Sequence, residues 1–183
     1  EKSEIILRVN CPSNDEISII KNKSILIGQF DPLSNKETIN KLIKKEVKIF
    51  SLNLLPRITR AQSMDVLSSQ ANLAGYRAVI ESVEEFGKAV PMMMTAAGTI
   101  TPAKVLVIGA GVAGLQAIAT AKRLGAIVSA TDVRTVAKEQ VESLGAKFLA
   151  VEGAENLETS GGYAKEAGEN FKKKTNGVIK KFS

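Results

Sequence analysis

The chain has 183 residues, 44% of them hydrophobic, and a formal net charge of +6 at pH 7. That length and composition suffice for one packed domain or two small ones. The sequence has no histidine and a single cysteine, Cys11, which excludes an internal disulfide, a Ser-His-Asp triad and an ordinary zinc site, so no metal is expected. No apolar run approaches the roughly 18 residues that span a bilayer, so no transmembrane segment is expected in this chain.

The first part of the chain predicts a separate α/β unit. Strand-like apolar runs occupy residues 5–9, 24–27 and 47–50, and a helical pattern covers about 36–45. Strands that alternate with helices are typical of a parallel sheet. We therefore expect residues 1–60 to form part of an N-terminal α/β domain.

A long helix is expected after the proline-broken stretch around Pro56. Its pattern runs from about residue 61 to residue 86, and small or apolar residues recur along it at steps of three and four, which predicts a buried seam. The small, proline-ended segment 96–102 predicts a flexible approach to the next domain, so that 61–100 forms a connecting helix and linker. The predicted seam consists of Met64, Leu67, Ala71, Ala74 and Ala78.

A glycine-rich turn follows this linker. A β-branched strand pattern over residues 104–108 leads into Gly109-Ala110-Gly111-Val112-Ala113-Gly114, and an alanine-rich helical pattern continues to about Leu124. The spacing G-x-G-x-x-G between a strand and a helix is the dinucleotide-binding fingerprint. Gly109 permits the tight turn, Gly111 lets the backbone approach a pyrophosphate, and Gly114 lets helix and strand pack closely. The structural alternative is a tight turn that binds nothing.

An acidic residue stands where this fold contacts the adenosine ribose. Asp132 ends a second strand, expected over 126–131, and follows Gly114 by 18 residues. A carboxylate at this point accepts hydrogen bonds from a ribose diol and repels a 2′-phosphate, which favours NAD over NADP. Arg134 is the residue that would pair with a 2′-phosphate, and we give it less weight because the neighbouring carboxylate would first have to be desolvated against that phosphate.

The residues after Asp132 complete one half of a dinucleotide fold. A helix over about 135–144 and a third strand over 147–151 give the order βαβαβ, and we interpret residues 101–165 as a Rossmann half. The second half does not follow, so the chain is interpreted as a fragment of a larger protein. Residues 166–183 form a basic tail without the interleaved aromatic residues of a nucleic-acid surface, so no nucleic-acid partner is expected.

The predicted fold class is therefore α/β. It combines an incomplete Rossmann-type dinucleotide-binding domain with part of a second α/β domain that precedes it. A parallel sheet is expected in each of these parts, because strand and helix patterns alternate in both.

Four segments carry a more specific signal: residues 57–65 (RITRAQSMD), 72–78 (NLAGYRA), 109–114 (GAGVAG) and 161–166 (GGYAKE). Together they resemble the NAD(H)-binding component, in the α subunit, of the proton-translocating NAD(P) transhydrogenases, within the alanine dehydrogenase/transhydrogenase family. The likeness is specific because the first and last of these segments are not general Rossmann features. It extends from about residue 54 to residue 174.

The resemblance implies that the enzyme consists of several components with different functions. This component holds NAD(H), a separate component holds NADP(H), a membrane-spanning component passes protons, and hydride moves directly between the two nicotinamides. The complete component is expected to be a homodimer. It is expected to lie on the cytoplasmic side of the inner membrane, attached peripherally through its partners.

The resemblance also implies the site residues. Arg57, Gln62 and Asp65 are expected to position the nicotinamide, and Gly162 with Tyr163 to form a mobile loop that closes over the nucleotide. On local pattern alone, the alternative for Arg57 and Gln62 is to cap the helix expected from about Ala61, and Tyr163 fits a surface loop as well as a lid. The remaining expected nucleotide contacts are Ser63, Met64 and Ser68 in the first segment, Gly109, Gly111, Val112 and Gly114 in the glycine turn, and Asp132, Val133 and Arg134 at the adenosine ribose.

Two other functions remain as alternatives. An alanine dehydrogenase shares the glycine turn, but its oxidative deamination requires a histidine, and this sequence contains none. Hydride transfer between two nicotinamides moves no substrate proton and needs positioning rather than acid–base residues. The second alternative is a truncated, non-catalytic remnant with weak nucleotide binding or none, because the nicotinamide half of the crevice is built from later strands.

Overall fold

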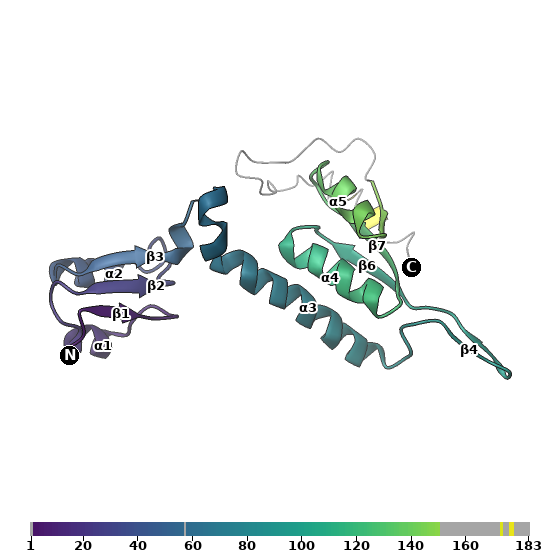
Figure 1. The fold of residues 1–183 in the computed structure, drawn as a ribbon, viewed down its shortest axis with the longest axis horizontal. Coiled ribbons are helices and arrows are strands. Elements are labelled where there is room, and N and C mark those ends of the chain that lie inside the picture. Colours follow the sequence, from purple (N-terminus) through teal and green to yellow (C-terminus); the bar gives the residue numbers. More distant parts are fainter. Residues whose placement is uncertain (1, 57, 151–172, 174–175, 178–183) are drawn as a thin grey trace. The chain divides into compact units, whose positions relative to one another are not determined.

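Figure 1 shows the fold of the chain as a computed structural model, which describes residues 2–56, 58–150, 173, 176 and 177. The chain divides into two compact units, Glu1–Leu67 and Ser68–Ser183. Each unit has its own three-stranded sheet and its own hydrophobic core. Both sheets are parallel, which confirms the prediction from the alternating pattern.

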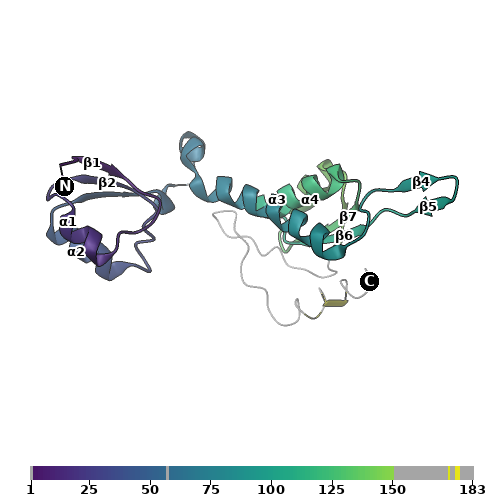
Figure 2. The ribbon, with the colours of Figure 1, turned by 90° about the horizontal axis from the view of Figure 1, so that it is seen from below.

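The first unit is built on the sheet β1-β2-β3, with β2 in the middle. The connecting helices α1 and α2 lie on the same side of this sheet (Figure 2), and the core of the unit includes Leu26 of β2, Leu42 of α2 and Phe30. The sequence analysis predicted every strand and α-helix described in this unit except α1, whose polar residues give no helical stripe. The elements are β1 (Ile5–Leu7), α1 (Asn14–Ile19), β2 (Ile25–Gly28), α2 (Lys36–Lys44) and β3 (Lys48–Ser51).

A capping box begins the short helix α1. Ser13 Oγ accepts the Glu16 N–H at 3.3 Å, and Glu16 Oε2 accepts the Ser13 N–H at 2.8 Å. Arg8, just beyond β1, donates to both carboxylate oxygens of Glu16 at 2.9 and 3.0 Å. The hydrogen bond from Arg8 is the largest cause that lowers the pKa of Glu16 to about 2. These contacts attach α1 to the end of β1.

The long helix starts later than the sequence predicts. Two short 3-10 helices, η1 (Leu52–Leu54) and η2 (Thr59–Met64), precede it, and α3 runs from Val66 to Phe86. The predicted start at residue 61 is therefore wrong. A bond of the i→i+3 type, from the Asp65 N–H to the Gln62 carbonyl at 3.2 Å, belongs to the tighter helix that occupies this stretch instead.

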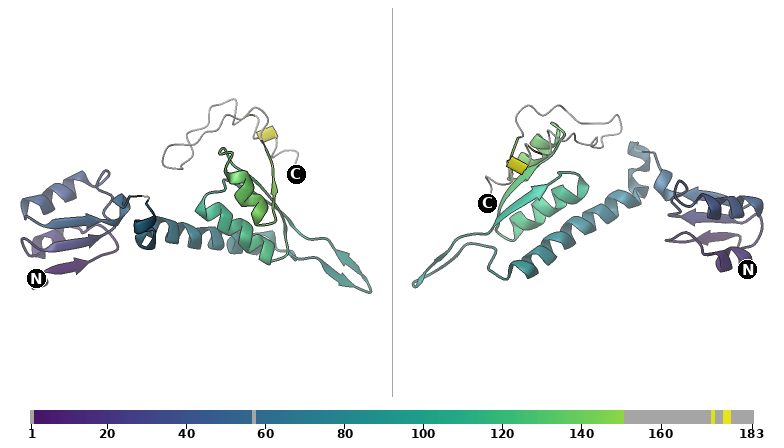
Figure 3. Two further views of the ribbon diagram at one scale, coloured as in Figure 1. Left: turned by 45° about the horizontal axis from the view of Figure 1, so that its top comes forward. Right: turned by 180° about the vertical axis from the view of Figure 1, so that it is seen from behind.

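The buried face of α3 also differs from the predicted seam. Gly75 and Val79 are its buried residues. Gly75 packs so closely on α4 (Val112–Arg123) that a Cβ would collide with the backbone of Ala113. This contact, rather than the alanine periodicity, decides which face of α3 is buried, and the two helices run side by side (Figures 1 and 3). The seam prediction is wrong for the exposed Met64, Leu67, Ala74 and Ala78, whereas Ala71 is half-buried.

An unpredicted β-hairpin separates α3 from the second sheet. Its strands β4 (Met93–Thr95) and β5 (Gly98–Ile100) pair antiparallel, and all their residues are exposed. The hairpin extends away from the second sheet (Figure 2). The segment 96–102, predicted as a flexible approach to the next domain, thus contains the strand β5, which the sequence analysis did not predict.

The second unit contains the predicted βαβαβ half. Its strands lie in the order β6-β7-β8, and the register of β6 with β7 runs from Lys104↔Ile127 to Ile108↔Thr131. The core lies between this sheet and the helices, with Ile118 of α4 and Val141 of α5 fully buried. The third strand was predicted over 147–151, but β8 ends at Phe148, and residue 151 lies outside the described residues. The elements besides α4 are β6 (Lys104–Ile108), β7 (Ile127–Thr131), α5 (Ala137–Ser143) and β8 (Lys147–Phe148).

Candidate functional site

The glycine turn joins β6 to α4. Gly109 has a φ of +94°, a left-handed conformation that residues with a side chain rarely adopt. Its N–H donates to the Thr131 carbonyl at 2.8 Å, so the turn begins against the end of β7. A Cβ at Gly114 would collide with the Gly109 carbonyl. Glycine at both positions therefore allows the sharp turn and the close approach of α4 to it.

Gly111 meets a different requirement. Its φ of −74° suits any residue, and a Cβ there would meet no atom within 4 Å. It immediately precedes Val112, the exposed first residue of α4. The first N–H groups of a helix have no intrahelical acceptor and lie at the positive end of the helix dipole. Open space beside them is what a pyrophosphate group needs.

Asp132 lies directly after β7, and its side chain is 5% exposed. Its Oδ2 accepts the Ala110 N–H at 2.6 Å, which links the strand end to the glycine turn. Arg134 donates its backbone N–H and Nε to Oδ1 at 2.8 and 2.9 Å, and its Nη2 to Oδ2 at 3.0 Å. A carboxylate offers about four acceptor positions, so these contacts occupy them all. Val133, between the two residues, is half-buried.

These contacts control the ionisation of Asp132. Burial acts to raise the pKa of this carboxyl, but the hydrogen bonds from the Arg134 side chain, the Arg134 N–H and the Ala110 N–H together outweigh burial. The net effect holds the pKa of Asp132 below its usual range. The buried carboxylate is therefore negative at neutral pH and paired with a guanidinium that is 15% exposed.

The arrangement suits recognition of a vicinal diol. A ribose hydroxyl donates one hydrogen bond, as Nε or Nη2 of Arg134 does, so the two hydroxyls of a diol can replace these two groups on the carboxylate. The Ala110 N–H meanwhile keeps Oδ2 oriented. The sequence analysis identified Asp132 and Arg134, but it missed their mutual pairing and the role of Ala110. The spacing of two residues between the acid and the arginine was the signal from which their pairing could have been predicted.

The other predicted group, at the nicotinamide, belongs to the end of the first unit. Gln62, Ser63 and Met64 are exposed on η2, and the half-buried Asp65 follows them. Ser68, in the first turn of α3, is half-buried and begins the second unit. The roles given to these residues remain predictions, as do those of Arg57, Gly162 and Tyr163, which lie outside the described residues.

A parallel βαβαβ half with a glycine turn and a buried carboxylate after the second strand defines a Rossmann-type α/β protein. Two family models match the chain: "Alanine dehydrogenase/PNT, N-terminal domain" over residues 1–74, and "Alanine dehydrogenase/PNT, C-terminal domain" over residues 78–179. The chain belongs to the alanine dehydrogenase/PNT family. This assignment confirms the resemblance inferred from the sequence.

Within this family, the chain is similar to subunits of NAD(P) transhydrogenases. The chain is 55% identical over 180 residues to the first portion of the NAD(P) transhydrogenase subunit alpha of Rhodospirillum rubrum, with 94% of this chain and 47% of the relative covered. It is 47% identical over 173 residues to NAD(P) transhydrogenase subunit alpha of Haemophilus influenzae, with 94% and 34% covered. The chain thus spans about half or less of the length of the curated relatives it matches.

Solved structures agree with this family. The crystal structure of a transhydrogenase from Sinorhizobium meliloti matches with a TM-score of 0.77 and 60% identity, over 81% of this chain and 45% of that chain. An L-alanine dehydrogenase matches with a TM-score of 0.66 and 19% identity, over 80% and 42%, which is a likeness of fold alone. The predicted α/β, Rossmann-type fold class is confirmed. Among the described residues, none of the helices has the length and apolar character needed to cross a bilayer.

Proposed function

We propose that this chain is the NAD(H)-binding part of a transhydrogenase that passes hydride between NADH and NADP⁺, coupled to proton translocation by a membrane-spanning partner. The observation that carries the proposal is the buried Asp132 carboxylate, hydrogen-bonded at 2.6 Å to the Ala110 N–H of the glycine turn. This bond holds an ionised acceptor for a ribose diol beside a helix start that suits a pyrophosphate. The proposed site therefore offers a partner to the ribose and a partner to the pyrophosphate of a dinucleotide.

Asp132 and Arg134 together favour NAD(H) over NADP(H) in this component. A 2′-phosphate brought to this position would face the negative carboxylate. The guanidinium that could neutralise the phosphate already pairs with both oxygens of Asp132. Breaking that pair to bind the phosphate would leave a buried, unpaired carboxylate, which is unfavourable. NADP(H) is therefore assigned to a separate component.

The proposed hydride transfer requires that the nicotinamide ring be oriented and that water be excluded from it. When bound, the nicotinamide supplies the hydride chemistry. Gln62 offers a donor and an acceptor to a carboxamide, Arg57 offers a rigid fork of donors, and Asp65 offers acceptors. These residues need only position the ring and exclude water, since no substrate proton moves. A sequence without histidine is suited to that reaction.

The partners follow from the same proposal. An NADP-binding component and a membrane-spanning component would complete the enzyme, and the complete NAD-binding component would be a homodimer. The chain would then lie on the cytoplasmic side of the inner membrane, bound peripherally through those partners. The relatives named as subunit alpha, or as a portion of that subunit, support an assembly of several components.

A titration with NADH tests the proposal. The fluorescence of NADH itself reports binding, since the chain has no tryptophan, and NADPH is titrated in parallel. We expect saturable binding of NADH in preference to NADPH. Asp132→Asn should weaken NADH binding about tenfold or more, because a hydrogen bond to a charged group contributes about 1.5–3 kcal/mol. Asp31→Asn, at an exposed carboxylate of the first unit, is the matched control and should bind as the parent does.

A non-catalytic remnant is the second candidate, because the strands β6-β7-β8 of the described residues correspond to one half of a dinucleotide fold. A correctly folded chain that binds neither nucleotide would support the remnant and contradict the proposal. Oxidation of L-alanine with formation of NADH would instead support the alanine dehydrogenase alternative.

A further inference from the structure

Two residues of the segment 72–78 contact α4, and neither was predicted to touch the nucleotide. Gly75 lies against the backbone of Ala113. Asn72 Nδ2 donates to Gln116 Oε1 of α4 at 3.1 Å. Asn72 and Gly75 are three residues apart and therefore lie on the same face of α3. The contact between the two helices thus combines a close backbone approach with a hydrogen bond between side chains.

The side chain of Gln116 is oriented by a second contact within α4. Its Nε2 donates to Thr120 Oγ1 at 3.0 Å, and the Thr120 hydroxyl donates to the Gln116 carbonyl at 2.8 Å. Thr120 is 6% exposed, so this hydroxyl is shielded from water. Because its proton is used on the carbonyl, Oγ1 accepts from Gln116, which leaves Oε1 as the acceptor for Asn72. The three side chains form a continuous series of hydrogen bonds from α3 into α4.

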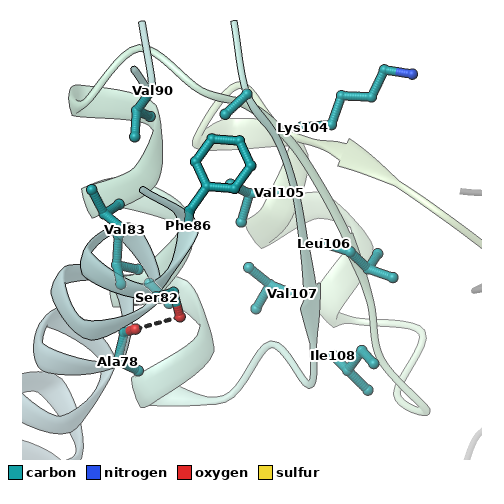
Figure 4. Close-up of a pocket in the computed structure, with 13 residues that line it drawn as sticks. Ala78, Ser82, Val83, Phe86, Val90, Lys104, Val105, Leu106, Val107 and Ile108 are labelled. Atoms are coloured by element: carbon teal, nitrogen blue, oxygen red, sulfur yellow. Dashed lines mark hydrogen bonds between the residues drawn. The ribbon is translucent and has the colours of Figure 1, made fainter. Parts of the chain in front are cut away.

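The remaining buried face of α3 is apolar and incompletely packed. Figure 4 shows Val105 and Val107 of β6 directed toward Val83 and Phe86 of α3, and a hollow of about 420 Å³ lies between these elements. Apolar contacts have no preferred direction, and the hollow leaves α3 room to shift. A hydrogen bond has a preferred direction, so a polar pair in an apolar helix contact can fix its register. Asn72 supplies that pair here.

The register of α3 on α4 matters because both helices carry predicted nucleotide contacts. Ser68 lies one turn before Asn72 on α3 and belongs to the group predicted at the nicotinamide. Gly111 and Val112 lie at the start of α4, where a pyrophosphate is expected. The bond from Asn72 to Gln116 therefore joins these two helices. A misplacement of about 1 Å can lower a reaction rate about 100-fold, so such a bond bears on hydride transfer.

We propose that Asn72 and Gln116, oriented by Thr120, are positioning residues that hold the nicotinamide side of the site in register with its pyrophosphate side. Neither residue needs to touch the nucleotide. The inference rests on the proposed function, because it requires that the chain bind NADH. It assigns the pair an effect on the nicotinamide half of the ligand and none on the adenosine half, whose proposed partner is Asp132.

Two ligands separate these halves. The full chain is titrated with NADH, followed by its own fluorescence, and with ADP, followed by calorimetry. ADP carries the adenosine and the pyrophosphate but no nicotinamide. Asn72→Ala and Gln116→Met each remove one partner of the bond. Each should lower NADH affinity about threefold to tenfold, as expected for the loss of one hydrogen bond, and leave ADP affinity unchanged. A purely structural defect would lower both affinities.

A double variant and a control complete the experiment. Asn72→Ala combined with Gln116→Met should lose no more NADH affinity than the weaker-binding single variant, because both changes remove the same bond. Gln70→Ala removes an exposed amide two residues earlier on α3, and it should bind both ligands as the parent does. Circular dichroism identifies a variant that fails to fold. Asn72 is exposed, so Asn72→Ala should fold and carries the test if Gln116→Met does not.

The possible contrary results have different meanings. A parent that binds NADH, with variants that bind it equally well, would overturn this inference and leave the proposed function standing. So would an equal loss of NADH and ADP affinity, or losses that add in the double variant. A parent that binds NADH no more tightly than ADP would hold no nicotinamide for the pair to position. A parent that binds neither ligand would contradict the proposed function itself.

Discussion

At the residue scale, the three glycines of the turn have separable roles. Gly109 and Gly114 meet steric requirements of the fold, through a φ of +94° and a contact that leaves no room for a Cβ. Gly111 meets no such requirement, because the space around it is open. The fold therefore gives no steric reason for glycine at this position, and the predicted reason is the approach of a pyrophosphate.

Substituting alanine at two of these glycines should separate stability from binding. We expect Gly111→Ala to leave stability unchanged or to raise it by about 0.4–1 kcal/mol, because alanine suits its φ and restricts the unfolded chain. NADH binding should nevertheless fall, since the new methyl group stands where the pyrophosphate approaches. Gly114→Ala should destabilise the second unit by about 1–3 kcal/mol through overpacking. Urea unfolding measures the stability of both variants, and NADH titration measures their affinity. Tight NADH binding by Gly111→Ala would contradict the role predicted for Gly111.

The pairing of Arg134 with Asp132 predicts a pH dependence. The folded pKa of Asp132 lies below its usual value, so the ionised form contributes stability and ribose affinity that are lost as pH falls through the folded pKa. Arg134→Gln removes the strongest lowering contact and leaves the effect of burial, so the pKa should rise. As pH falls, NAD⁺ affinity of this variant, measured by calorimetry, should therefore begin to decline at a higher pH than that of the parent. The parent should keep its affinity to lower pH, because its Asp132 pKa is lower.

Arg123→Gln controls for the loss of a positive charge. Arg123 is exposed in the last turn of α4, away from Asp132. A parent-like profile for Arg134→Gln would show that the guanidinium does not control the ionisation of Asp132.

At the element scale, the contact of α3 with α4 depends on Gly75. The helix is rich in alanine, but burial follows the close approach over Ala113 instead of the alanine spacing. A periodic pattern identifies a helix and its length, but a single close contact with a neighbouring helix can change which of its faces is buried. Only the position of the neighbouring helix supplies that information.

Gly75→Ala should therefore destabilise the second unit. The added Cβ collides with the Ala113 backbone, so the helices must separate, and we expect a loss of about 1–3 kcal/mol in the free energy of unfolding. Leu73→Ala, at an exposed position two residues earlier, should change stability by less than about 0.5 kcal/mol. Urea unfolding followed by circular dichroism measures both. Equal stability of the two variants would mean that the helices do not pack as described.

At the scale of the whole molecule, the described residues form two separate cores. Leu42 is fully buried in the first and Ile118 in the second, and no residue belongs to both clusters. The proposed nucleotide contacts are likewise divided, with Gln62 and Asp65 in the first unit and Asp132 in the second. A substitution in the core of one unit is therefore expected to destabilise that unit and to leave the other unchanged.

Hydrogen exchange with mass spectrometry tests this independence. Leu42→Ala should lower the stability of the first unit by about 2–5 kcal/mol and speed the exchange of β2. Peptides of β7 should be unaffected. Ile118→Ala should produce the reverse pattern, with a loss of similar size in the second unit. Faster exchange in both units for either substitution would mean that they unfold together.

The sequence by itself determined the parallel strands, the glycine turn, the acid at Asp132 and the family. These are local signals, because apolar periodicity and fixed spacings act within a few turns of chain. It did not predict the β4–β5 hairpin, which is short and fully exposed, nor the 3-10 helix η2, which shares a helical pattern with α3.

Only the tertiary structure decided the buried face of α3 and the hydrogen bonds of Asp132. Each depends on residues far apart in the chain: Gly75 meets Ala113, and Asp132 meets Ala110 across the strand end. Sequence periodicity specifies what a segment can bury, whereas packing between segments decides what it does bury. For this reason the candidate residues were readable from the sequence, and their electrostatic coupling was not.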